Sequence, residues 1–135
     1  MYETFEHTAD MGLRVTAPDL AGLFEEAACG LFSLVVSGVP ESNGRVREIR
    51  IPGERHDYLL LDWLAELLSL SSAEAVWFDG FNVQLDDRGI NARTREHSLR
   101  SAGITVLTEI KAITYHGLKL ERSPDGWVAE IVVDL

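Results

Sequence analysis

Apolar residues recur at the three- and four-residue spacing of helices in two stretches of this chain, and segments with the two-residue alternation of strands enclose both. The first helical stretch covers residues 20–35, with Asp19 placed to cap it or to lie in its first turn. The second covers residues 60–70, with Asp57 as its expected N-cap and Ser71-Ser72 as its end. Two helices between runs of strands indicate an α+β fold.

The strand pattern predicts mostly antiparallel pairing. Residues 2–6 and 12–17 alternate on either side of a short connector, which is typical of a hairpin. The turn sequence Ser123-Pro124-Asp125-Gly126 predicts a second hairpin near the end of the chain. Further strands are expected over residues 45–51, in an exposed or edge position, and over residues 76–85, 90–99, 104–120 and 127–135. We therefore expect one domain over residues 1–135, with two amphipathic helices packed on a largely antiparallel β-sheet system.

Net charge limits the classes of partner. The chain has 135 residues with 22 acidic and 12 basic side chains, a formal charge of −10 that repels phosphate backbones. Strong autonomous binding of nucleic acid is therefore not expected, whereas docking on a basic partner or gathering cations fits the charge, as does simple solubility. The single Cys29 points to a reducing compartment, for which the cytoplasm is the default. No membrane-spanning run or signal peptide is expected from the sequence.

Several enzyme classes lack their motifs here. The sequence has no Walker phosphate loop, no Gly-rich dinucleotide fingerprint, no His-Glu-x-x-His zinc helix and no Gly-x-Ser-x-Gly elbow. Cys29 lies on the apolar side of the first helical stretch, so it is expected to be a buried structural thiol and not a nucleophile.

Two aspartates near the chain ends are candidate metal ligands. Asp10 lies at the connector of the first hairpin, where an Asx-type turn is the equal alternative, and Asp134 is the penultimate residue. The terminal carboxylate of Leu135 adds another oxygen donor, and such a set suits calcium, magnesium or manganese better than zinc. This site requires Asp10 and Asp134 to meet across a sheet, which periodicity does not establish. The role of His7, beside the connector, stays open between a ligand, a proton donor and a plain hydrogen-bonding residue.

A lysine in the last third of the chain is a third candidate. Strand alternation places Lys111, Ile113 and Tyr115 on one face of the run Lys111-Ala112-Ile113-Thr114-Tyr115-His116. Lys111 can pair with an acidic site or with a partner's phosphate or carboxylate, or it can be a solvated strand-edge residue.

Five stretches of the chain together resemble the archease family, in family order and over nearly the whole length. These are His7-Thr8-Ala9-Asp10-Met11-Gly12-Leu13-Arg14-Val15, Leu23-Phe24-Glu25-Glu26-Ala27-Ala28, Leu61-Asp62-Trp63-Leu64-Ala65-Glu66-Leu67-Leu68, Glu109-Ile110-Lys111-Ala112-Ile113-Thr114-Tyr115-His116 and Val132-Val133-Asp134-Leu135.

The resemblance implies an accessory protein of the RtcB-type RNA ligase, which acts in tRNA splicing and RNA repair. Such accessories are not enzymes themselves; they promote GTP-dependent guanylylation of the ligase and its multiple turnover. By resemblance, Asp10, Asp134 and Leu135 bind a divalent metal, and Lys111 joins Asp10 and Asp134 as a candidate for activation. GTP is used by the ligase, so no nucleotide site is expected on this chain.

One departure and two alternatives accompany the resemblance. Where the family often has Gly-Glu, this chain has Arg95-Glu96, which leaves the local turn and the role of Glu96 open. A general chaperone or adaptor is the main alternative function, with Asp10 and Asp134 purely structural. A metal-dependent hydrolase is a weaker alternative, because no clear base or nucleophile lies near either aspartate in the sequence.

Overall fold

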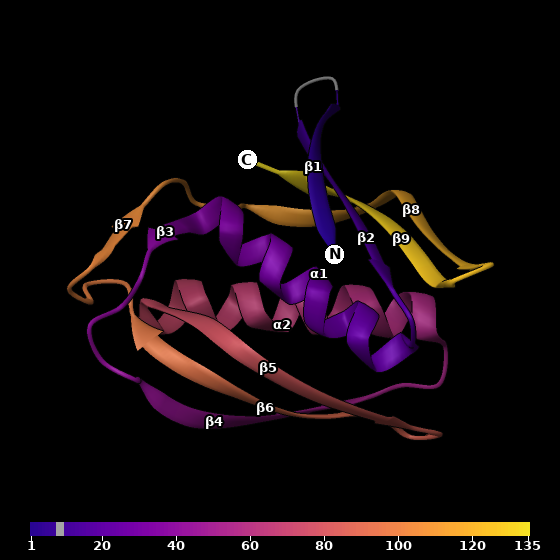
Figure 1. Ribbon diagram of the computed structural model, residues 1–135, viewed down its shortest axis with the longest axis horizontal. Coiled ribbons are helices and arrows are strands. Elements are labelled where there is room, and N and C mark those ends of the chain that lie inside the picture. The colour runs from indigo at the N-terminus through magenta and orange to yellow at the C-terminus, as the bar shows by residue number, and fades with distance from the viewer. Residues whose placement is uncertain (8–9) are drawn as a thin grey trace.

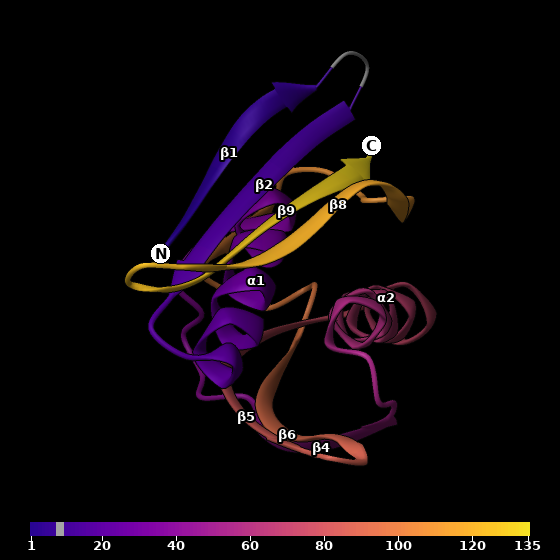
Figure 2. The ribbon, with the colours of Figure 1, turned by 90° about the vertical axis from the view of Figure 1, so that its right-hand side faces the viewer.

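The computed structural model describes residues 1–7 and 10–135. Two antiparallel sheets form the outer layers, and both helices lie between them (Figures 1 and 2). The elements are β1 (Tyr2–His7), β2 (Asp10–Ala17), α1 (Leu20–Val35), β3 (Val36–Gly38), β4 (Arg45–Pro52), α2 (His56–Glu74), β5 (Val76–Asp86), β6 (Gly89–Ser98), β7 (Ile104–Val106), β8 (Ala112–Ser123) and β9 (Gly126–Asp134). The expected α+β class with two helices on antiparallel sheets is confirmed.

The first sheet combines both ends of the chain. Its strand order is β1-β2-β9-β8, so the two predicted hairpins lie side by side, joined by antiparallel pairing of β2 with β9. Helix α1 packs on β2 and β9, where fully buried Leu13, Val15 and Ile131 face it. The N-terminal and C-terminal hairpins therefore share one hydrophobic core although they are remote in sequence.

The second sheet has the order β4-β6-β5, and β4 is at its edge, as the charged sequence of residues 45–51 predicts. A ribbon of β3 paired with β7 lies beside the layers (Figure 1). The strand predicted over residues 104–120 is wrong as a single element. The chain changes partner between β7 and β8: the Leu107 N–H still donates to the Val35 carbonyl beside the ribbon (2.7 Å), whereas the Lys111 N–H donates to the Asp134 carbonyl at the end of β9 (2.8 Å).

Helix α1 has its predicted bounds and cap, whereas α2 departs from the prediction at both ends. Asp19 caps α1 as predicted, since its side chain accepts the Gly22 N–H at 2.7 Å. Asp57 is not the N-cap of α2; it lies in the first turn, and Arg55 occupies the cap position. Helix α2 also continues past Ser71, because the buried Ser71 hydroxyl donates to the Val76 carbonyl instead of ending the helix. Ala75, in the left-handed conformation at φ 53°, ends it.

Trp63 connects the two helices in the middle layer. Its side chain is fully buried, and its indole N–H donates to the Phe24 carbonyl of α1 at 3.0 Å. Its ring meets Phe81 of β5 edge to face, with centroids 6.0 Å apart. This one side chain therefore joins both helices to the second sheet.

Replacing Trp63 by Phe is expected to lower the free energy of unfolding by about 1–3 kcal/mol, because it removes a buried hydrogen bond between the two helices and part of a fully buried ring. Urea unfolding followed by circular dichroism measures this. Replacing the exposed Tyr58 of the same helix by Phe is the control, with a change within about 0.5 kcal/mol. An equal loss of stability in the Trp63→Phe and Tyr58→Phe variants would contradict the stabilising role of the Trp63 hydrogen bond.

Candidate site at the open end of the first sheet

The register of β2 and β9 brings Asp10 and Asp134 to the same end of the first sheet. Met11 pairs with Val133, so the next position along each strand is an aspartate, Asp10 on one and Asp134 on the other. Residues directly opposite each other on antiparallel strands have Cβ atoms about 4.5–5.5 Å apart, and their side chains share a face. The two aspartates that are 124 positions apart in the chain are thus neighbours in space.

The shared face of these aspartates is the one turned away from the helices. Val133 is fully buried, and Met11 packs against the core, so both face α1. Because side chains alternate across a strand, Asp10 and Asp134 point to the opposite side. Asp10 is half-buried and Asp134 is exposed. The Thr8-Ala9 connector and the His7 side chain, which the sequence includes in the motif, lie outside the described residues.

Gly12, which the sequence analysis places in a strand, has a packing role in the structure. It lies within β2, where a Cβ would come within 2.2 Å of the Phe5 ring of β1. The absence of a side chain therefore lets the Phe5 ring pack over Gly12, on the same face as the two aspartates.

Lys111 lies beside the aspartates but on the other face of the sheet. Its N–H donates to the Asp134 carbonyl at 2.8 Å, and the next residue, Ala112, pairs with Asp134. Alternation therefore places Lys111 with Ile113, which packs against the core, on the helix side. Lys111 lines a hollow between α2 and β8 instead of reaching over the carboxylates.

The donor set at this sheet end suits a hard cation with open coordination. All the candidate ligands are oxygen donors: the Asp10 and Asp134 carboxylates and the terminal carboxylate of Leu135. Leu135 is 38% exposed. Among the side chains that the structure describes, no group of three or more His, Cys, Asp or Glu gathers around a common point. An ion held here would therefore keep several positions for water or for a partner's ligands, as magnesium commonly does.

Glu96, which the sequence left unassigned, is the buried centre of an ion cluster whose other members reach the surface. Its side chain is 3% exposed and accepts hydrogen bonds from Arg45 at 2.5 Å and Arg47 at 2.6 Å. Arg47 also pairs with Glu74 at the end of α2 (3.1 Å). Burial of the Glu96 carboxylate opposes its ionisation, but the two guanidinium groups outweigh this and hold its pKa below the ordinary value. The cluster ties β4 and β6 to α2, which is a structural role.

Replacing Glu96 by Gln is expected to destabilise the protein by about 1–3 kcal/mol at neutral pH. Because the folded-state pKa is lowered, the contribution is present above the unfolded-state pKa, about 4.3, and is lost as pH falls through the lower folded-state value. Urea unfolding at pH 7 and at successively lower pH measures the difference. The Glu48→Gln control removes an exposed pair with Arg93 and should cost less than about 1 kcal/mol. A difference independent of pH would contradict this assignment.

A buried His97 on the outer face of β6 is a feature that sequence reasoning missed. Its Nε2 lies 2.7 Å from Asp79 Oδ1, and its ring stacks on Trp77 with centroids 4.6 Å apart. Among the described side chains, His97 Nδ1 and Trp77 Nε1 are buried without a hydrogen-bond partner. Trp77 is directly opposite His97 on the neighbouring strand, so the register of β5 with β6 would have revealed the pair. That register is not evident from the sequence.

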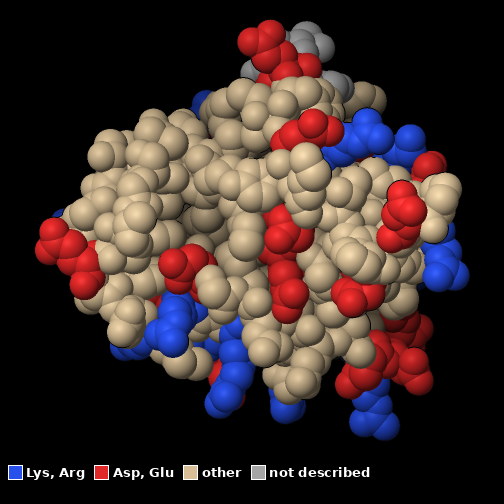
Figure 3. Space-filling model, in the orientation of Figure 1, with Lys and Arg blue, Asp and Glu red and all other residues tan. Residues whose placement is uncertain are grey.

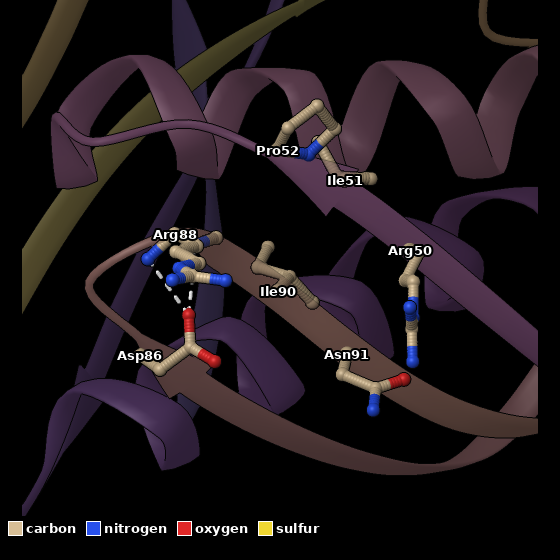
Figure 4. Close-up of a pocket in the computed structure, with 8 residues that line it drawn as sticks. Arg50, Ile51, Pro52, Asp86, Arg88, Ile90 and Asn91 are labelled. Carbon is tan, nitrogen blue, oxygen red and sulfur yellow. Dashed lines mark hydrogen bonds between the residues drawn. The ribbon is translucent and has the colours of Figure 1, made fainter.

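The hollow in Figure 4 is remote from these candidates. It lies beside the turn between β5 and β6, has a volume of about 460 Å³ and is lined by Arg50, Arg88 and Asn91 among others. Asp86 is turned onto the turn backbone, where its Oδ1 accepts the N–H groups of Arg88 and Gly89 at 2.7 and 3.1 Å. The lining of this hollow contains none of the candidate site residues that the sequence analysis named.

Cys29 is half-buried and not fully buried as expected. Burial, and then the nearby carboxylates of Glu26, Glu25 and Asp79, raise the pKa of its thiol. A raised pKa lowers the thiolate fraction, so the thiol is a poor nucleophile, in agreement with the sequence-based interpretation.

These observations define an α+β domain with two helices between antiparallel sheets and both chain ends on one sheet. Within that class, the chain belongs to the archease family: the family model described as "Archease protein family (MTH1598/TM1083)" matches residues 2–135. Proteins named archease from Pyrococcus abyssi and Methanosarcina acetivorans are 35% and 34% identical to it, over 99% of this chain and 98% and 95% of theirs.

Two solved structures share the fold. The solution structure of Methanobacterium thermoautotrophicum protein 1598 superposes with a TM-score of 0.75 at 28% identity, covering 99% of this chain and 98% of that one. The crystal structure of a Thermotoga maritima archease, described as a "possible chaperone", gives 0.69 at 24% identity, covering 100% and 98%. No helix in the described part of this chain is long and apolar enough to cross a membrane.

Proposed function

We propose that this protein is a cytoplasmic accessory that activates an RtcB-type RNA ligase in tRNA splicing and RNA repair. It promotes GTP-dependent guanylylation of the ligase and multiple turnover, and it catalyses no reaction of its own. Family membership supports the accessory role. The observation that carries the proposal is the β2–β9 register, which leads Asp10 and Asp134 to one end of a sheet.

The candidate metal site would act by charge and position. A divalent ion there would supply positive charge to nucleotide phosphates, which is the chemistry that a hard cation contributes to phosphoryl transfer. Asp10, Asp134 and the Leu135 carboxylate would hold the ion from one side and leave the other side open. The Lys111 ammonium, on the opposite face, would add a cation toward the partner and not toward the ion.

The test is ligase guanylylation with and without this protein. Purified ligase, GTP and a divalent metal are mixed, and both the guanylylated ligase and the number of ligations per ligase are counted. We expect this protein to raise both at substoichiometric amounts. Unchanged values over a full titration would overturn the proposal.

A chaperone or adaptor role is the second candidate. It is favoured by apolar side chains that stay exposed around the β3–β7 ribbon: Val39 at 78%, Val106 at 50% and Leu107 at 55%. Suppression of aggregation of an unrelated client, retained in a variant lacking both aspartates, would support this role against the activator.

A metal-dependent hydrolase is the third candidate function of the carboxylates. Turnover of phosphoester substrates by the purified protein with magnesium or manganese would reveal it.

A further inference from the structure

Helix α2 and strand β8 are neighbours, on the right of Figure 2 below the C-terminus, and a hollow lies between α2 and residues 109–113. We call this region the α2–β8 seam and define it by Tyr58, Ala65 and Ser69 of α2, Lys111 just before β8, and Tyr115 of β8. Strand β8 is at the edge of its sheet, so no further strand of the described chain covers this side.

An exposed pair of tyrosines marks one end of the seam. Tyr58 is 46% and Tyr115 62% exposed, and their ring centroids are 6.2 Å apart. The Arg55 guanidinium lies 4.4 Å from the centre of the Tyr58 ring. Tyrosine and arginine are the residue types most enriched at the energetic centres of protein interfaces, so large exposed rings here are a cost to the isolated chain that a partner can remove.

The backbone of β8 is shaped to present Tyr115. The register with β9 shifts between Thr114 and Lys119, and Gly117, at φ 82°, adopts the left-handed conformation within this bulge. The His116 N–H donates to the Thr114 hydroxyl at 3.0 Å, which holds the bulge in place of a ladder bond. Bulges re-aim side chains and end strand pairing, and they are frequent next to functional sites.

A hollow of about 500 Å³ forms the other end of the seam. Small exposed side chains of α2, including Ala65 and Ser69, face residues 109–113 across it. Lys111 lines this hollow, and no carboxylate in the described residues lies within 4 Å of its ammonium. The hollow adjoins the candidate site, because the Lys111 N–H bonds to the Asp134 carbonyl.

Charge favours a basic occupant. Strands β4 to β6 and their turn (residues 45–52 and 76–98) contain six Arg and five acidic residues, whereas the rest of the chain has six basic and seventeen acidic residues. Figure 3 shows Lys and Arg side chains along the lower edge of the molecule, over the β4–β6 sheet. On α2, Asp62 and Glu66 are exposed one and two turns after Tyr58. A nucleic-acid strand along the seam would place its phosphates against these carboxylates.

We propose that the α2–β8 seam is the docking surface for the partner ligase, which presents a positively charged protein surface with an apolar side chain for the Tyr58–Tyr115 pair. This inference rests on the proposed function, since it takes the ligase as the partner. It places the Asp10–Asp134 end of the sheet at the edge of the interface, next to the ligase active site.

The test separates affinity from activation. Fluorescently labelled protein is titrated with purified ligase, and the Kd is read from anisotropy at two salt concentrations. We expect Tyr58→Ala with Tyr115→Ala to raise the Kd at least about tenfold, and Asp62→Lys with Glu66→Lys to weaken binding and reduce its salt dependence. Guanylylation by the Tyr double variant should recover at saturating concentration, because its carboxylates are intact.

Matched variants control for folding. Tyr58→Phe with Tyr115→Phe keeps both rings and should bind as the unmodified protein does, and Val46→Ala changes an exposed apolar residue on the opposite sheet. An unchanged Kd for the Tyr58→Ala, Tyr115→Ala protein would overturn the docking surface. Binding of a single-stranded RNA that is lost in the same variant would overturn the choice of a protein occupant. Failure of the unmodified protein to stimulate guanylylation, despite normal binding, would instead reject the proposed function alone.

Discussion

Replacing Asp10 or Asp134 by Asn is expected to reduce stimulated guanylylation of the ligase about 100-fold, the effect of removing a group that stabilises developing charge. Asn keeps the size of the side chain and one oxygen donor but removes the negative charge that a divalent ion needs. Isothermal titration with calcium and manganese should show at least about tenfold weaker binding for each variant. The loss should not grow much further in the double variant, because the two residues act on one ion.

The control for this experiment is Asp125→Asn. Asp125 lies in the turn between β8 and β9, at the other end of the same sheet, so its replacement changes the net charge equally and leaves the candidate site intact. Full stimulation by both Asp10→Asn and Asp134→Asn would remove these residues from the activation mechanism. Normal metal binding together with lost stimulation would place the ion elsewhere.

The helices and hairpins of this fold are predictable because their signals are local. The capping position of Asp19 and the Pro-Asp-Gly turn before β9 depend on residues within one turn of each other, and the structure confirms both. The short ribbon of β3 with β7 is different. Each of its strands has three residues, and its pairing depends on a partner about 70 positions away, so no local pattern reveals it.

The candidate site likewise has a part that local sequence predicts and a part that depends on long-range pairing. The sequence supplies the donor types of Asp10 and Asp134, but their meeting depends on which hairpin strands become neighbours, and that is decided by the apolar faces of β2 and β9 that α1 covers. For Lys111, the sequence motif does not show on which face of the sheet the side chain lies. Its motif places it with the aspartates, whereas strand alternation in the folded sheet places it on the other side.

Because Lys111 and the two aspartates lie on opposite faces of the sheet, Lys111→Met is expected to reduce activation without weakening metal binding. Met keeps the length of the stem and removes the ammonium, so metal binding measured by titration should change less than about twofold. Stimulated guanylylation should fall about 10- to 100-fold, even at saturating concentrations of the variant, because the lost charge faces the partner and not the ion. Lys119→Met is the matched control, since Lys119 is the other lysine of the chain, lies on β8, which directly follows Lys111, and pairs at 3.7 Å with Glu121. If Lys111→Met weakened metal binding as much as Asp134→Asn does, the two side chains would have to meet on one face, against the register of β8 with β9.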